Sequence, residues 1–309
     1  MSTLALRKSA PAAGTTPGTA QGPPPAFGGG TPMRRRIGLV PTVTLLAGAI
    51  YCLLPVAWVV IASTKSGKEL FSTFTFWPGT GFADNLKDLN AYRDGIYWTW
   101  MGNSALYAVL GALLSTAVSA VSGYALAIYR FKGREALFSI LLAGVLMPPV
   151  ILAVPQYLLL AKVNMTDSYV SVFLPQVLSP YGVYLARIYA SAAVPPDVVE
   201  AGRMDGAGEW RIFTRIALPM MLPGLVTVFL FQFVAVWNNF LLPYIMLSDD
   251  EKFPITLGLQ TLLEQGANTP ALYTLVITGA FLAVIPLIAL FLVIQRFWSL
   301  DLLSGAVKS

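Results

Sequence analysis

A charged, turn-rich run occupies residues 195–224, PPDVVEAGRMDGAGEWRIFTRIALPMMLPG, between two strongly apolar segments. Pro196 is suited to open a helix, because the first helical position needs no N–H. Glu200 then lies near the helix N-terminus, where negative charge is favourable. Gly206 and Gly208 are expected to end this helix after about three turns. The run therefore predicts a short helix and a turn at a membrane surface, in a shape suited to docking on another protein.

A second short helix is predicted after these glycines. Trp210, Phe213 and Ala217 recur at helical spacing and are expected to share one face of it. Pro219 marks entry into the next apolar segment, because proline is tolerated in the first turn of a helix. The second half of the run should therefore bury the face that carries Trp210, Phe213 and Ala217, with its arginines on the other faces of the helix.

Composition indicates a membrane protein. The chain has 309 residues, of which 56% are hydrophobic and 11% charged, whereas soluble domains contain about 25% charged residues. It has no His and a single Cys, Cys52, so neither a disulfide framework nor a Cys/His metal site is expected. The net charge of +5 comes mostly from residues at the ends of apolar segments. Membrane topology explains that charge better than nucleic-acid binding does.

The hydropathy pattern predicts an all-α integral membrane protein with a six-helix transmembrane bundle. About 20 apolar residues cross the hydrocarbon core, and the segments that meet this length are approximately residues 37–62, 101–129, 136–161, 169–190, 219–247 and 271–297. Residues 1–33 are rich in Pro, Gly, Ala and Thr and are expected to be a disordered tail. Residues 34–309 would form the transmembrane domain, with residues 191–218 as the loop between the fourth and fifth crossings.

The distribution of positive charge predicts the orientation of the bundle. Lys and Arg gather at the chain ends and in the loops that lie on the same side as the ends, including residues 191–218. Cytoplasmic loops of membrane proteins carry this excess. Both termini and the 191–218 loop are therefore expected in the cytoplasm.

The same loop carries a family resemblance. Glu200-Ala201-Gly202, Gly206 and Ile216-Ala217-Leu218-Pro219 resemble the "EAA" loop in membrane subunits of binding-protein-dependent ABC importers, although the family has Ala where this chain has Gly202. The resemblance implies the type I ABC importer permease fold and a coupling helix that sits in a groove of a cytoplasmic ATPase. The coupling-loop residues that it implies are Glu200, Ala201, Gly202, Asp205, Gly206, Ala207, Phe213, Ile216, Leu218 and Pro219.

Shorter motifs are similar to the carbohydrate-uptake branch of this family, and specifically to the second permease of maltose-type sugar importers. These motifs are Asn103-Ser104, Gly123-Tyr124-Ala125-Leu126-Ala127, Met147-Pro148-Pro149 and Gly305-Ala306-Val307-Lys308. The resemblance runs from about residue 40 to the C-terminus. It implies a bacterial plasma-membrane protein whose partners are a second homologous permease, two cytoplasmic ATP-binding subunits, an extracytoplasmic solute-binding protein and a carbohydrate.

Residues 237–240, Trp-Asn-Asn-Phe, are the candidate for contact with the solute. Sugar recognition uses aromatic faces and amide groups, and this tetrapeptide offers both. Helical spacing would place Phe233, Trp237, Phe240 and Tyr244 in one stripe. An interfacial aromatic belt or amide links between helices would explain the same residues without a ligand. The candidate pathway residues are Gln232, Phe233, Trp237, Asn238, Asn239 and Phe240.

Missing motifs narrow the function. The chain has no G-x-x-x-x-G-K-[ST] sequence, the motif that binds the phosphates of ATP. A separate subunit must therefore hydrolyse ATP. This chain is not expected to be an enzyme or to hold a cofactor. A secondary transporter would show ionisable residues deep in its spans, and none is found there. An ABC importer for a non-sugar solute and a purely structural membrane protein remain alternatives. The long loop at residues 63–100 could be a lid, a binding surface or simply solvated.

Overall fold

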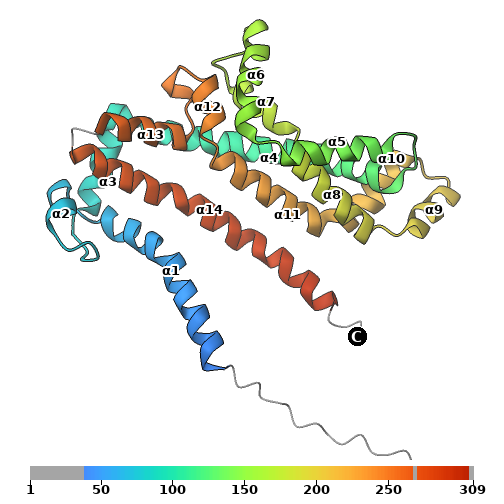
Figure 1. The fold of residues 1–309 in the computed structure, drawn as a ribbon, viewed down its shortest axis with the longest axis horizontal. Coiled ribbons are helices and arrows are strands. Elements are labelled where there is room, and N and C mark those ends of the chain that lie inside the picture. Colours follow the sequence, from blue (N-terminus) through green and yellow to red (C-terminus); the bar gives the residue numbers. More distant parts are fainter. Residues whose placement is uncertain (1–37, 267–269, 306–309) are drawn as a thin grey trace, which may run out of the picture. The chain divides into compact units, whose positions relative to one another are not determined.

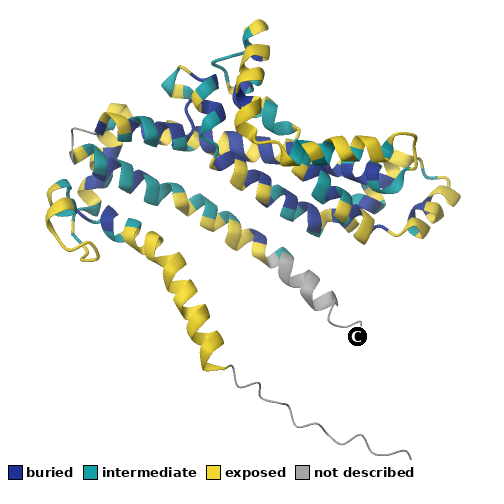
Figure 2. Cartoon of the chain, viewed as in Figure 1, coloured by how far each residue is buried: buried dark blue, intermediate teal, exposed yellow. Residues whose placement is uncertain are grey.

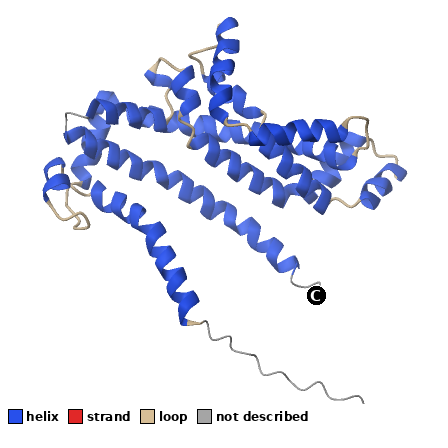
Figure 3. Ribbon diagram, viewed as in Figure 1, coloured by secondary structure: helices blue, strands red, loops and turns tan. Residues whose placement is uncertain are grey.

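The computed structural model describes residues 38–266 and 270–305. The described residues fall into two parts, residues 38–50 and residues 51–305, and each part is described by itself. All regular elements of the described residues are helices, as Figure 3 shows, which confirms the predicted all-α class. The helix α1, Leu39–Ser63, begins in the first part and ends in the second.

The remaining helices all belong to the second part (Figure 1). In chain order they are α2 Gly67–Ser72, α3 Phe82–Ala91, η1 Tyr92–Gly95, α4 Ile96–Ile128, α5 Arg134–Leu146, α6 Pro149–Lys162, α7 Tyr169–Val177, α8 Pro180–Ala193, α9 Pro196–Met204, α10 Glu209–Ile212, the π-helical η2 Phe213–Ala217, α11 Leu218–Trp237, α12 Leu241–Met246, η3 Asp250–Lys252, α13 Ile255–Gln265 and α14 Pro270–Gly305.

Four helical stretches of the described residues are long and apolar enough to cross a bilayer. They are Leu39–Ser63, Phe82–Ile128, Glu209–Trp237 and Ala271–Gln295. The pair α5 and α6 passes the same criterion only when taken together, and its two helices are bent by 102°. The six-crossing topology stays a prediction.

Three of the six predicted segments are broken rather than continuous. Residues 136–161 divide between α5 and α6, because a residue before proline avoids the helical conformation and Pro148, which precedes Pro149, is extended. Residues 169–190 divide before Pro180 in the same way, with Ser179 extended. Residues 219–247 divide between α11 and α12. There Pro243 cannot donate to the carbonyl four residues earlier.

The helix α4 is the centre of the second part, packed against α7, α8 and α11. Small residues allow close approach: an added Cβ on Gly123 would lie 2.6 Å from the Ala186 Cβ, and the Tyr189 ring covers Gly224. Close approach at small residues is a usual way for membrane helices to associate. Buried residues accordingly run along α4, α8 and α11 (Figure 2).

Polar contacts fix the connection between α12 and α13 on the N-terminal end of α4. The Trp100 Nε1–H donates to the Asp250 carbonyl at 2.9 Å. The Asn103 amide donates to the Glu251 carbonyl at 2.7 Å, and the Tyr107 hydroxyl donates to the Lys252 carbonyl at 3.0 Å. Because all three acceptors are backbone groups, this connection is held in one conformation by the side chains of α4.

Asp167, in the turn between α6 and α7, ties the same connection from a second direction. Its carboxylate accepts the backbone N–H groups of Ser248 at 3.0 Å and Asp249 at 3.1 Å. The Lys252 ammonium lies 3.7 Å from it. These bonds, with the Asp249 N–H first, lower the pKa of Asp167 below its ordinary value.

We expect acid to weaken this tie. A carboxyl whose pKa is lower in the folded state contributes stability that is complete above its unfolded pKa, about 3.9 for Asp, and is lost as the pH falls through the folded value. The thermal midpoint of the detergent-solubilised protein should therefore fall less steeply below about pH 4 in Asp167→Asn than in the unmodified protein. Asn tolerates the backbone φ of 52° at this position. If the thermal midpoint of Asp167→Asn fell at low pH as steeply as that of the unmodified protein, this role of Asp167 would be contradicted.

Candidate functional site

The helix α9 begins and ends close to where the sequence predicts. Pro195 is extended and Pro196 occupies the first turn. The last turn closes at Gly206, which has φ +75° and donates its N–H to the Arg203 carbonyl at 3.0 Å. The Ala207 N–H donates to the Gly202 carbonyl at 3.0 Å. A left-handed residue at this point is how many helices end, and glycine adopts it without a steric penalty.

The predicted second short helix is instead the first part of a long one. The elements α10, η2 and α11 follow one another without interruption from Glu209 to Trp237. In η2 the Leu218 N–H donates to the Phe213 carbonyl, five residues back. Phe213 and Ala217 are buried as expected, but Trp210 is 69% exposed.

A small apolar contact seats α9 on this helix. Gly202 is buried, and an added Cβ there would lie 3.2 Å from Ile212 Cγ1 and 3.3 Å from Ile216 Cδ1. Val199 and Ile212 are also buried. An added methyl group at residue 202 would require these isoleucine side chains to shift by a few tenths of an ångström. Ile212 was not among the predicted site residues, although its helical spacing to Ile216 is the signal that could have identified it.

Glu209 connects three elements at this end of the molecule. The Arg203 guanidinium donates Nε–H to Glu209 Oε1 at 2.7 Å, and the Tyr129 hydroxyl donates to Glu209 Oε2 at 2.7 Å. Burial, with Glu209 as acceptor, raises the pKa of Tyr129, which keeps its hydroxyl protonated as the donor. The bonds therefore brace α9 against α10 and against the end of α4, and we call these three residues the brace.

The predicted coupling-loop residues divide by exposure. Those that face solvent are Glu200, Ala201, Asp205, Gly206 and Pro219. Those that are buried or half-buried, and so support the loop from inside, are Gly202, Ala207, Phe213, Ile216 and Leu218. Two large apolar side chains project beside the exposed set without having been predicted: Met204 is 88% exposed and Trp210 is 69% exposed. The Trp210 ring lies beside that of Phe213, with centroids 5.5 Å apart, whereas Met204 lies in the last turn of α9.

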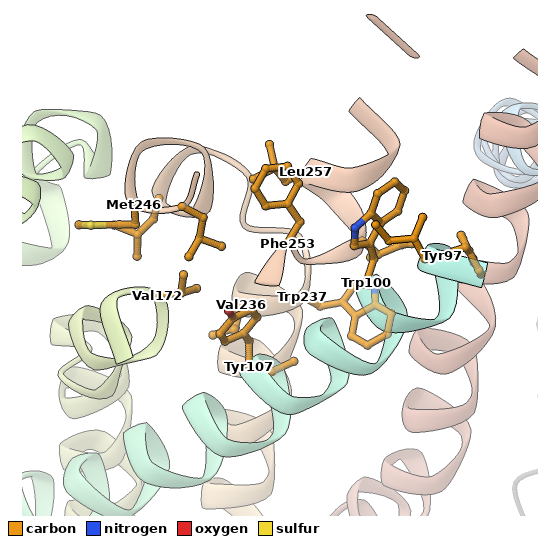
Figure 4. Close-up of a cluster of buried hydrophobic side chains, with 14 of the residues drawn as sticks. Tyr97, Trp100, Tyr107, Val172, Val236, Trp237, Met246, Phe253 and Leu257 are labelled. Atoms are coloured by element: carbon orange, nitrogen blue, oxygen red, sulfur yellow. The ribbon is translucent and has the colours of Figure 1, made fainter. Parts of the chain in front are cut away.

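The predicted solute stripe is divided by the break between α11 and α12. Phe233 and Trp237 stack on each other at 5.6 Å between ring centroids and are buried in the chain's own core, where Figure 4 shows Trp237 near Trp100 and Tyr107. Phe240 and Tyr244 form a separate stacked pair at 5.4 Å. The aromatic faces of Phe233 and Trp237 are thus occupied by neighbours in this conformation.

Two of the amide side chains that were predicted to line the solute pathway lie beside the break between α7 and α8. The Gln232 amide donates to Ser179 Oγ at 2.6 Å, and the Asn239 amide donates to Gln176 Oε1 at 3.2 Å. Asn238 is exposed and donates to the carbonyl of Val234. Two interrupted helices are therefore tied together where each is interrupted.

Comparison with known proteins agrees with this architecture. Residues 116–300 match the family model described as "Binding-protein-dependent transport system inner membrane component". The arabinooligosaccharides transport system permease protein AraQ of Halalkalibacterium halodurans is 34% identical over 263 residues, which cover 84% of this chain and 92% of that protein. The lactose transport system permease protein LacG of Rhizobium radiobacter is 30% identical over 280 residues, or 90% and 99% of the two chains.

A solved structure has the same fold. A chain in the crystal structure of a bacterial ABC transporter involved in the import of the acidic polysaccharide alginate matches with a TM-score of 0.74 and 23% identity, over 86% of this chain and 99% of that chain. This likeness confirms the predicted ABC importer permease fold. The matched family region contains the braced loop and all three interrupted segments. The protein is a multi-pass component of the plasma membrane and belongs to the family of inner membrane components of binding-protein-dependent transport systems.

Proposed function

We propose that this chain is one permease subunit of an ATP-driven sugar importer and that the α9–α10 loop couples it to a cytoplasmic ATPase. The observation that carries the proposal is Met204, which is 88% exposed on a loop held by the brace. The names of AraQ and LacG, which refer to arabinooligosaccharides and lactose, support a carbohydrate as the solute. The site is a docking and coupling device and carries out no chemical step.

The remaining subunits follow from this role. A second homologous permease supplies the other half of the pathway, two ATP-binding subunits lie in the cytoplasm, and an extracytoplasmic binding protein delivers the sugar. Both termini of this chain lie in the cytoplasm, an orientation supported by the positive charge of the 191–218 loop.

The loop transmits motion because it is rigid. The brace links α9 to α4, and α10 continues directly into α11. A displacement of α9 by the ATPase therefore tilts α4 and α11 instead of deforming the loop. ATP binding shifts the permease between its two states only to the extent that the ATPase binds those states unequally.

We expect Met204→Asp to release the ATPase. A charge in the centre of an apolar docking contact must be desolvated without a partner, and truncation of a central anchor costs about 2 kcal/mol or more. Affinity should fall about thirtyfold, measured as loss of the ATPase when the tagged permease complex is purified. Met204→Leu is the matched control and should retain the ATPase. Retention of the ATPase by Met204→Asp would contradict the docking surface.

Transport itself is tested with the complete importer in proteoliposomes. Uptake of arabinooligosaccharides or lactose that requires internal ATP and the cognate binding protein is the expected result. Uptake of a phosphorylated solute or an amino acid with no sugar uptake would favour the non-sugar alternative. Uptake that persists without ATP would instead favour a secondary transporter.

A further inference from the structure

Lys65, two residues after the end of α1, is a buried cation without a carboxylate partner. It is only 2% exposed. Its ammonium donates to the Phe74 carbonyl at 2.7 Å and takes part in no ion pair among the described residues. An ammonium has three N–H donors, and lysine is almost never fully buried unless it is paired. The described part of the chain therefore leaves the charge of Lys65 without a counter-charge.

Glu69, four residues further on, has another role. Its carboxylate accepts the Ser66 backbone N–H at 2.9 Å and the Ser66 hydroxyl at 3.0 Å, and these bonds cap the start of α2. The pKa of Glu69 is lowered first by the Ser66 N–H, then by the Ser66 hydroxyl, and least by the charge of Lys65. The carboxylate is thus held at the helix start and does not pair with the buried ammonium.

A cavity of about 240 Å³ lies beside Lys65, between the end of α1, the helix α2 and the helix α14. The two helices α2 and α14 pack against each other (Figure 1). No acidic side chain of the described residues lines the cavity, and most of its wall is apolar or aromatic: Trp58, Ala62, Leu70, Phe71, Tyr273 and Ile277. A small inorganic anion would find few polar partners here, and a buried charge is costly without them. The cavity suits an anionic group that carries hydrocarbon.

The side of α1 that leads to this cavity is apolar. Leu54, Trp58 and Ala62 follow one another at four-residue spacing and therefore share one face of α1. Leu54 is 48% exposed and Trp58 is 36% exposed, whereas Ala62 is buried at the cavity. In membrane proteins Trp is enriched at the level of the lipid headgroups, and Lys extends its ammonium to the same level. A hydrocarbon chain that follows this face ends beside Lys65.

We propose that this cavity binds the phosphate group of a membrane phospholipid, with the phosphate at the Lys65 ammonium and an acyl chain along Leu54 and Trp58. The phosphate supplies the counter-charge that Lys65 lacks, and hydrogen bonds between ionised groups are among the strongest in proteins. The lipid contacts α1, α2 and α14 together and so stabilises their junction. This site is separate from the α9–α10 loop and from the sugar pathway, and its test does not depend on transport.

Binding is measured on the purified complete importer in detergent. Phosphatidylglycerol, diacylglycerol and inorganic phosphate are added separately, and the thermal midpoint and the lipid retained in native mass spectra are recorded. Phosphatidylglycerol should raise the midpoint and stay bound, because it combines phosphate with hydrocarbon. An equal effect of diacylglycerol would show that the phosphate is not recognised and would overturn the proposal. An equal effect of inorganic phosphate would show a site for free anions and would overturn the lipid.

Variants assign the binding to this cavity. Lys65→Met keeps a long apolar side chain without the ammonium and should weaken phosphatidylglycerol binding about tenfold or more, the effect expected for loss of a charged hydrogen bond. Lys68→Met is the matched control, since it removes the same charge from an exposed neighbour, and it should bind as the unmodified importer does. Thr75→Trp, at an exposed residue of the cavity wall, should block binding with Lys65 still present. Unchanged affinity in Thr75→Trp, or equal affinities in Lys65→Met and Lys68→Met, would overturn the proposal.

Discussion

Replacing Gly206 by valine is expected to abolish ATP-driven uptake while leaving the protein in the membrane. Gly206 has φ +75° and no neighbour within 4 Å of an added Cβ, so the penalty is conformational and not a clash within the chain. A non-glycine residue in this region costs about 1–2 kcal/mol, and a β-branched residue is least suited to it. The turn should leave its native conformation and displace α9 from its seat on Ile212 and Ile216. Uptake and permease-stimulated ATP hydrolysis in proteoliposomes are the measurements.

Gly208 provides the matched control for this variant. It also has no neighbour within 4 Å of an added Cβ, but its φ of −68° and ψ of 155° are available to any residue. Gly208→Val should therefore keep the turn. Gly206→Asn should retain part of the activity, because Asn tolerates the left-handed region. Normal uptake by Gly206→Val would show that the turn is not needed for coupling.

A second large effect is expected from a single methyl group on α4. In Gly123→Ala the new Cβ would lie 2.6 Å from both Ala186 Cβ and the Arg187 nitrogen, and 2.7 Å from the Ala186 carbonyl carbon. Backbone atoms cannot rotate away, so α4 and α8 must separate along their contact. Overpacking of this kind costs about 1–3 kcal/mol and occasionally more. Because α8 leads directly to the α9 loop, the yield of folded protein and the thermal midpoint in detergent should both fall.

Gly102, on the same helix, has no neighbour within 4 Å of an added Cβ. Gly102→Ala should raise the thermal midpoint, since Ala is favoured over Gly in a helix by about 1 kcal/mol. The two variants add the same methyl group to α4, and they are expected to change the thermal midpoint in opposite directions. Equal midpoints for both variants would show that α4 and α8 do not approach as closely as described.

Local chemistry was sufficient to predict the helical membrane class and the loop. Apolar length and the scarcity of charge specify membrane helices, because an unsatisfied backbone is costly in hydrocarbon. Proline and glycine specify the ends of α9 in the same local way, and Gly206 has the positive φ that its position in the run predicts. Features of this kind depend on neighbours in the chain and can therefore be read from the sequence.

Contacts between distant residues decided the rest. The separation of Phe233 and Trp237 from Phe240 follows from the break near Pro243, where the Asn239 carbonyl accepts the Thr256 hydroxyl at 2.9 Å. Helical spacing alone predicted one stripe, because it assumes a helix that continues past Trp237. The brace likewise joins residues as far apart as Tyr129 and Glu209. Packing selects which face of a helix is buried when several faces are equally apolar, so only the tertiary structure could show that Phe231 and Trp210 are exposed while Trp237 and Ile212 are buried.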